Sequence, residues 1–316
     1  MSAGAPELTP VDIRLSFRLG ELGLFHKRLS GFADRTHFSC RLPCNGVPSI
    51  DEALDASLVY YPTYPIAVAP PAIVLRDGWI AYTPYVFKNY YIDVSRFDDF
   101  DDYLRTALSS KSRATLLRKV RKFAQTDGGA TQWRRFDRGE DMARFFEDAG
   151  KVSARSYQER LLDSGLPRTA EFIAQAESSA DAGRTVGFVL YLRDKPAAYM
   201  YCALHNGVAT YEHVGYDPEL RSLSPGTVLH YHALKSIFDS GTVRIFDFTE
   251  GEGTHKAFFA SDHQLCAKTY FLKRNLLNQV LVRSHHGLSR GVELAGRVLD
   301  RMGIKSAVKR LIRRLA

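Results

Sequence analysis

The residues of this sequence that are best suited to chemistry lie in the segment DPELRSLSPG at 217–226, between a predicted strand and a predicted helix. Gly226 opens that helix, so the backbone there can approach a ligand closely. The first N–H groups of a helix lack partners and lie at the positive end of its dipole, which together make an anion pocket. Arg221 adds a guanidinium whose fork fits phosphate. The alternative is an ordinary connection that Ser224 caps and Pro225 opens.

Two other stretches carry side chains that bind anions or ring systems. The segment SKSRATLLRKVRK, which ends at Lys122, has the pattern of a basic helix. Arg118 and Arg121 in this helix are candidate contacts for an anionic substrate, and a solvated helix face is the alternative. The stretch Tyr82–Tyr91 is dense in aromatic residues that could stack on a sugar or a base. A place in the core is the more usual role of such residues.

The elements that must position these residues follow from the periodicity of the sequence. Residues 11–95 show strand signals, such as the alternation of apolar and polar residues from Ile13 to Leu19. Residues 98–122 are predicted to be helical, with acidic residues in the first turn. From residue 131 onward the predicted order is a strand, two helices, three strands, a helix, a strand, a short helix and a strand. This order indicates the α/β class with a mixed sheet (α+β).

An ordered set of motifs runs from Tyr211 to Lys256. The strand YEHVGY is followed by an Arg-x-x-Ser-Pro-Gly loop, then by the strand VRIFDFTEG, and then by His255-Lys256. In this order and spacing the set resembles the GNAT superfamily of acyltransferases, and the resemblance covers residues 111–274. More narrowly, it resembles the CelD-like branch associated with cellulose and exopolysaccharide biosynthesis, which is related to the Fem-type aminoacyl transferases.

The resemblance implies a GNAT fold and a division of the chain into three parts. Residues 106–282 would form the acyltransferase domain, and residues 283–316 a basic amphipathic helical tail. Residues 1–105 would form a β-rich domain or a diverged second GNAT-like unit. The resemblance also implies acetyl-CoA or another acyl-CoA as co-substrate.

The donor cradle implied by the resemblance consists of the loop residues and the neighbouring strand edge. The sequence departs from the family's Gln/Arg-x-x-Gly-x-Gly/Ala loop, because it offers one glycine and a proline there, so an aminoacyl-tRNA or another acyl donor stays open. Lys256 matches a lysine of the related pattern and is a candidate contact for a phosphate or a carboxylate. The cradle residues are Arg221, Ser222, Ser224, Gly226, Val214 and Tyr216.

A GNAT site also needs a base that deprotonates the acceptor amine or hydroxyl. The candidates are Asp247, Glu212 and His213. Asp247 ends its predicted strand, which is a usual place for site residues in α/β sheets; a solvated carboxylate is the alternative. Strand alternation places Tyr211 and His213 on one face and Glu212 on the other. Both faces therefore carry a titratable group, and the choice between them stays open.

The formal charge of the chain is +8, and its location matters more than its size. Residues 283–316 hold nine Lys or Arg and two acidic residues, so residues 1–282 carry about +1 in total. Leu288, Val292 and Ala295 recur at helical spacing in this tail. Such a cationic amphipathic helix can pack on its own domain, lie on an anionic membrane surface, or bind nucleic acid.

The composition excludes several other classes of protein. Apolar residues make up 45% of the 316 residues, and no apolar run approaches the ~18 residues needed to span a membrane. The first ten residues, MSAGAPELTP, do not read as a signal peptide. Four cysteines are too few for a disulfide framework, and the spacing of Cys40, Cys44, His26 and His37 matches no common zinc site. We therefore expect a cytoplasmic protein without a metal, in peripheral contact at most with the inner face of the membrane.

Three functions stay open at the level of the sequence. The first is transfer of an acetyl or other acyl group from acyl-CoA to an amine or hydroxyl of a small molecule, a sugar or a cell-envelope precursor. The second is Fem-like aminoacyl transfer from charged tRNA, which the missing loop glycine and the basic helix favour. The third is a non-catalytic GNAT-fold protein docked to a membrane complex through its tail.

Overall fold

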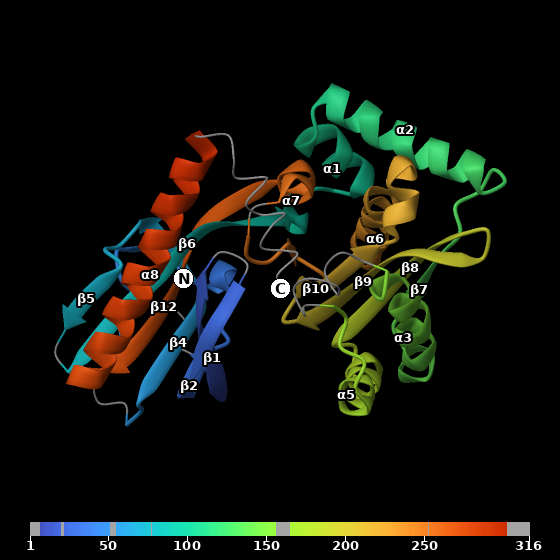
Figure 1. Ribbon diagram of the computed structural model, residues 1–316. Helices are drawn as coiled ribbons and strands as arrows, with labels where there is room; N and C mark the ends of the chain where they lie inside the picture. The colour runs from blue at the N-terminus through green and yellow to red at the C-terminus, as the bar shows by residue number, and fades with distance from the viewer. Residues whose placement is uncertain are drawn as a thin grey trace. The chain divides into compact units, whose positions relative to one another are not determined.

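The computed structural model describes residues 7–19, 22–50, 55–76, 78–155, 165–251 and 253–301. The chain forms two compact units (Figure 1). The first unit consists of Met1–Lys88 together with Gln264–Ala316, and the second consists of Asn89–His263. The first unit is thus built from both ends of the chain, and the second from its middle.

In the first unit a sheet packs against one long helix, α8. The strands lie in the order β1-β2-β4-β12-β6, with β3 beside β4 and β5 beside β6. β1 and β2 pair antiparallel over most of their length, and β12 pairs antiparallel with β4. The elements are β1 (Leu8–Leu19), β2 (Leu22–Asp34), η1 (Phe38–Cys40), β3 (Cys44–Asn45), β4 (Leu58–Val68), β5 (Ile73–Arg76), β6 (Trp79–Asp93), β12 (Asp262–Lys273) and α8 (Leu276–Arg301).

The alternation in β1 explains how α8 packs on this sheet. Leu15 and Phe17 are buried, whereas the residues between and beside them are exposed, which confirms the predicted strand. Val282 of α8 is buried in the same apolar cluster, and Leu288 packs against that cluster. His285 of α8 donates from Nε2 to the carbonyl of Ser16 at 3.2 Å. Among the described residues, no helix combines the length and the apolar content that a membrane crossing requires.

The second unit contains a mixed sheet in the order β7-β8-β9-β10-β11, with the end of β6 beside β11. Neighbours from β7 to β10 are antiparallel, β10 and β11 are parallel, and β11 is antiparallel to β6. The elements are η2 (Val94–Arg96), α1 (Phe100–Ala107), α2 (Ser110–Thr126), β7 (Trp133–Phe136), α3 (Gly139–Ser153), α5 (Ala170–Asp181), β8 (Thr185–Leu192), β9 (Lys195–His205), β10 (Val208–Tyr216), η3 (Pro218–Leu223), α6 (Pro225–Ser240), β11 (Ile245–Asp247) and α7 (Thr254–Phe259).

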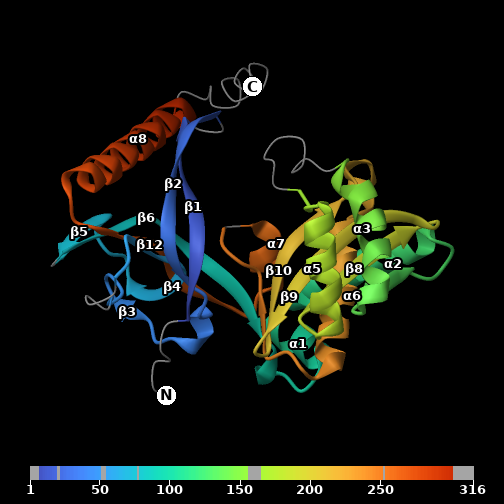
Figure 2. The same cartoon turned by 90° about the horizontal axis from the view of Figure 1, so that it is seen from below.

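Helices cover both faces of this second sheet (Figures 1 and 2). α1, α2 and α6 pack on one face, where Phe188 and Met200 lie in the same cluster as residues of these helices. α3 and α5 pack on the other face, together with Val189 and Tyr199. Successive residues of β8 and β9 point to opposite faces, and because helices cover both faces, these strands contain runs of consecutive buried residues. This three-layer arrangement is the mixed α/β class expected from the sequence.

The structure changes two helix predictions. Residues 98–122 form two helices instead of one, because Ser109 caps a new helix by accepting a hydrogen bond from Ser112 N at 3.2 Å. The first of the two helices predicted after residue 131, over 140–162, is α3, which ends at Ser153; residues 156–162 of that prediction lie outside the described residues.

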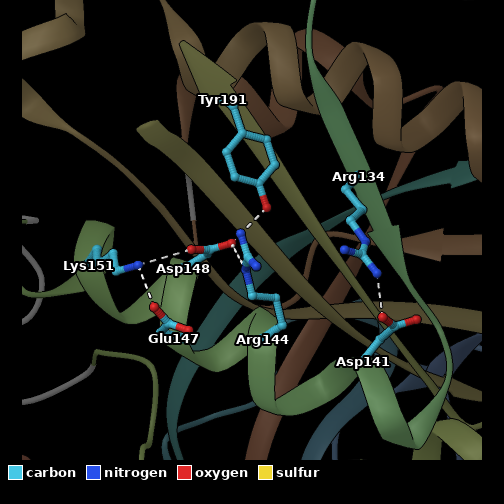
Figure 3. Close-up of polar contacts among 7 residues, drawn as sticks. All are labelled: Arg134, Asp141, Arg144, Glu147, Asp148, Lys151 and Tyr191. Carbon is cyan, nitrogen blue, oxygen red and sulfur yellow. Dashed lines mark hydrogen bonds and ion pairs between the residues drawn. The ribbon is translucent and has the colours of Figure 1, made fainter. Parts of the chain in front are cut away.

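A polar network fixes α3 to β8 (Figure 3). The buried carboxylate of Asp148 accepts hydrogen bonds from Arg144 Nε at 3.0 Å, from the Tyr191 hydroxyl at 2.9 Å and from Lys151 Nζ at 3.3 Å. Burial opposes ionisation of Asp148, but the three donors outweigh it, so the pKa of this carboxyl is lowered. The network therefore serves to anchor the helix that covers one face of the sheet.

Candidate functional site

The site begins where two parallel strands part. β10 and β11 pair only between 208–210 and 245–247. Beyond that point β10 continues on β9 to Tyr216, whereas β11 ends at Asp247. The edge of β10 from Tyr211 to Tyr216 therefore does not pair with β11.

Asp217 fixes the start of the predicted anion loop. Its side chain is buried, and its Oδ1 accepts a hydrogen bond from Glu219 N at 3.1 Å. Its Oδ2 is 2.7 Å from Arg155 Nη1 of the segment that follows α3. Asp217 was not among the predicted site residues, although an Asp before a Pro is a common signal for the start of such a turn.

The start of α6 has the features of an anion site. Ser224 is the N-cap residue of α6, as the alternative of an ordinary connection expects, but it adopts the left-handed conformation (φ 54°, ψ 48°) and its side chain makes no capping hydrogen bond. Pro225 follows and has no N–H, which makes Gly226 and Thr227 the first residues of α6 with an amide to donate. A Cβ at Gly226 would lie 3.6 Å from the Tyr216 ring, so this turn and that ring stand side by side.

The basic helix α2 lies against the same loop. Lys122 Nζ donates a hydrogen bond to the carbonyl of Ser222 at 3.1 Å. Arg118 and Arg121 are exposed on α2, and Arg221 is exposed on the loop. The structure thus brings the basic helix beside the predicted donor cradle, a proximity that their separation of about a hundred residues in the sequence does not reveal.

The end of β11 holds Asp247 in a defined place. Asp247 is buried, and its Oδ1 accepts hydrogen bonds from Asn89 Nδ2 at 2.6 Å and from Thr249 N at 2.8 Å. Thr249 has a left-handed backbone (φ 60°), which turns the chain sharply after the strand. Asn89 is fully buried and was not among the predicted site residues, because it lies within an aromatic strand far from the motifs.

Lys256 closes the turn that follows Asp247. Its Nζ donates to the carbonyl of Glu250 at 2.7 Å and to that of Thr249 at 3.3 Å, and it lies 5.5 Å from the centre of the Tyr211 ring. Burial lowers the pKa of Lys256, while Asp247 and Glu250 act in the opposite direction. The predicted role of Lys256 as a ligand contact stays a prediction, and its contacts in this structure bind the turn together.

A tyrosine and two histidines link this turn to α6. The Tyr211 hydroxyl and His255 Nε2 form a hydrogen bond of 3.0 Å. His230 is buried and donates from Nδ1 to the carbonyl of Gly226 at 2.7 Å, and burial lowers its pKa to about 4. His255 is partly exposed; burial of part of its ring lowers its pKa, and nearby Lys256 lowers it further. Both imidazoles are therefore neutral near pH 7.

A β-bulge changes the expected faces of β10. The register with β9 shifts between Tyr211 and His213, so Glu212 is an extra, exposed residue. Tyr211 faces α6, with its ring 6.0 Å from that of His230, whereas His213 lies 6.1 Å from Phe172 of α5. The expectation that Tyr211 and His213 share a face is thus wrong. Asp247 and Lys256 lie with Tyr211, and His213 lies on the opposite face of the sheet.

The comparisons with known proteins agree with this geometry at the level of the fold. Residues 110–257 match the family model of the acetyltransferase (GNAT) domain. No curated protein matches the chain.

Several solved structures resemble the chain at low sequence identity. The C-terminal domain (DUF2156) of a putative lysylphosphatidylglycerol synthetase from Agrobacterium fabrum is 11% identical, with a TM-score of 0.47, over 73% of this chain and 72% of that chain. The L-PGS of Bacillus licheniformis is 13% identical, with a TM-score of 0.42, over 72% of each chain. FemX is 14% identical, with a TM-score of 0.42, over 63% of this chain and 65% of its own. The match of residues 110–257 to the GNAT acetyltransferase domain, together with the mixed α/β sheet, makes the fold GNAT-like.

Proposed function

We propose that this chain is an acyltransferase that moves an acetyl or other acyl group from acyl-CoA to an amine or hydroxyl. The acceptor is a small molecule, a sugar or a cell-envelope precursor such as an exopolysaccharide of the CelD-like branch. One observation carries the proposal: the loop at 217–226 enters α6, without a capping hydrogen bond from the Ser224 side chain, where β10 parts from β11.

In this proposal the donor's pyrophosphate lies against the first turn of α6. The amides of Gly226 and Thr227 and the positive end of the helix dipole favour an anion there, and the exposed Arg221 adds a cation. Ser222 and Ser224 shape the loop, and the acyl arm follows the free edge of β10 from Val214 to Tyr216. The basic residues of α2, including Arg118 and Arg121, extend the positive surface beside Ser222.

The chemical step needs a proton acceptor at the acceptor nucleophile. The nucleophilic nitrogen or oxygen bonds to the thioester carbonyl carbon, the C–S bond breaks, and the proton of the nucleophile is carried to the departing sulfur, so CoA leaves as a thiol. We assign the proton acceptor to His255, which is neutral and partly exposed, and the orientation of its ring to the Tyr211 hydroxyl. Asp247 then acts by holding the turn.

Two other bases compete with this assignment. Glu212 is an exposed carboxylate at the bulge where the strands part, and it is the first rival. His213 is the second rival, but it packs on the face that carries α5. Single substitutions of the three residues to Gln, each followed by a rate measurement at saturating donor and acceptor, separate them.

Calorimetric titration of the purified protein with acetyl-CoA and longer acyl-CoAs tests the donor. We expect saturable binding that Arg221→Ala weakens by roughly tenfold, the loss of one charged hydrogen bond. Arg138→Ala, which removes an exposed arginine at the start of α3, is the matched control. The CoA proposal is wrong if the wild type binds none of these thioesters.

Aminoacyl transfer from charged tRNA is the second candidate function. The contact of the basic helix α2 with the donor loop favours it, because exposed arginines beside the loop offer phosphate contacts to a large anionic donor. This candidate is supported if the protein binds tRNA and the logarithm of the binding constant falls steeply with the logarithm of the salt concentration. The double variant Arg118→Gln/Arg121→Gln should then bind tRNA more weakly. Absent or salt-independent binding would exclude it.

A further inference from the structure

We propose that the outer face of α8 is a docking surface for an anionic phospholipid membrane. By the outer face we mean the side of the helix turned away from the first unit's sheet. It carries the apolar residues Leu276, Val280, Leu294 and Val298 and the basic residues Arg283, Arg290, Arg297 and Arg301. This inference is independent of the proposed acyl transfer.

The inner face of α8 is already occupied by its own unit. Val282 is 1% exposed, and Leu281 and Leu288 pack against the same cluster. His285 is held between the Tyr82 hydroxyl and the Ser16 carbonyl. The apolar stripe noted in the sequence thus starts, at Leu288, against the protein, and the opposite side of the helix is the one presented to a partner.

The outer face combines charge and apolar surface in one line. Arg283, Arg290 and Arg297 recur every seven residues, which places them one above another on a helix. The same side of the helix carries large apolar side chains that remain exposed: 76% at Leu276, 57% at Val280, and 54% at both Leu294 and Val298. The acidic residues of α8 are Glu293 and Asp300, and Glu293 Oε2 lies 3.5 Å from Arg297 Nη2. A surface helix of this composition lies in the plane of a membrane interface.

The charge and the apolar surface of the outer face together favour one of three partners: a membrane, a nucleic acid or a second copy of the chain. An anionic membrane surface satisfies both, since its headgroups attract the arginines and its acyl boundary accepts leucine and valine. Nucleic acid satisfies the arginines but leaves the apolar side chains in water. A second copy of α8 would bring two rows of arginines together, which like-charge repulsion opposes.

The test uses the full-length chain and vesicles of phosphatidylcholine alone or mixed with phosphatidylglycerol. In a flotation assay we expect binding to the mixed vesicles only, and weaker binding at high salt. The charge variant Arg283→Gln/Arg290→Gln/Arg297→Gln is expected to lower the partition coefficient by on the order of 100-fold. The apolar variant Leu294→Gln/Val298→Gln is expected to lower it by on the order of 10-fold.

A variant with the same change of net charge elsewhere is the control. Arg96→Gln/Arg138→Gln/Lys195→Gln removes three exposed positive charges from the second unit and is expected to bind vesicles as the wild type does. Circular dichroism confirms that each variant is folded. The proposal is overturned if the wild type does not bind the mixed vesicles. It is also overturned if the charge variant binds them as well as the control variant does, which is the result expected if residues 302–316 alone carry the binding. Binding of the wild type to a short RNA, lost in the charge variant and without any vesicle binding, would also overturn it.

Discussion

Asn89 Nδ2 donates a hydrogen bond of 2.6 Å to Asp247 Oδ1, and this bond joins the end of β6 to the end of β11. Both side chains are buried, and buried polar groups of native proteins are normally hydrogen-bonded. The same carboxylate oxygen holds Thr249 N, which starts the turn that Lys256 closes. The pair thus determines where the backbone leaves the sheet beside the parted strands.

The first prediction concerns this pair. Asn89→Ala and Asp247→Ala should each lower the free energy of unfolding by about 1–3 kcal/mol, because each removes a buried hydrogen bond to a charged group. In the double variant the two losses should not add, and a coupling of about 0.5–3 kcal/mol should remain. Urea denaturation of the four proteins measures this coupling. Additive losses would show that the two side chains act independently.

The second prediction concerns the pH dependence of transfer. A base must be unprotonated, so activity that depends on His255 is full above its pKa and falls as the pH drops through it. Burial and Lys256 lower this pKa, so the fall should lie below the ordinary value of about 6.5. Lys256→Gln removes a nearby positive charge and should move the fall to higher pH, whereas Glu212→Gln should not. If Glu212→Gln, and not Lys256→Gln, changes the acidic limb of the pH–rate profile, Glu212 is the base.

The third prediction compares two glycines. A Cβ at Gly215 would lie 2.5 Å from Tyr199 Cε1, so Gly215→Ala forces that ring to move and should cost about 1–3 kcal/mol of stability. At Gly226 the nearest contact would be an ordinary 3.6 Å, so Gly226→Ala should change stability by less than about 0.5 kcal/mol. It should nevertheless weaken acyl-CoA binding, because the methyl group enters the space beside Tyr216. Unchanged affinity in a calorimetric titration would place the donor elsewhere.

The fourth prediction concerns stability in acid. The folded pKa of Asp148 lies below the unfolded value of about 3.9, so its ionised form stabilises the protein above that pH, and this stabilisation is lost as the pH falls through the folded pKa. Asp148→Asn should cost about 1–3 kcal/mol at neutral pH, and the difference from the wild type should narrow below about pH 4.

Asp141→Asn is the control for this fourth prediction. Asp141 pairs with Arg134 nearer the surface of the same region (Figure 3), and such pairs contribute about 0–1 kcal/mol. Thermal unfolding at a series of pH values measures both variants. An equal loss of unfolding free energy in the two variants would mean that the buried network of Asp148 stabilises the protein no more than the surface pair does.

The sequence predicted the elements of the second unit well, because each is a local pattern. The three strands from Thr185 to Tyr216 and the loop into α6 follow from alternation and turn residues alone. The bulge at Glu212 could not be predicted in this way, since one extra residue in a strand leaves the composition unchanged and yet exchanges the faces. Asn89 and His255 were missed for another reason: their partners, Asp247 and Tyr211, lie 158 and 44 residues away.

The origin of the first unit from both ends of the chain has a consequence for synthesis on the ribosome. β4 is made early, but β12, which pairs with it, begins at Asp262. The sheet of the first unit therefore cannot be completed until the whole of the second unit has been translated. Since compact units fold as their residues emerge, the middle of the chain reaches its final structure before the beginning does. Until then the apolar face of β4 needs another form of protection from aggregation.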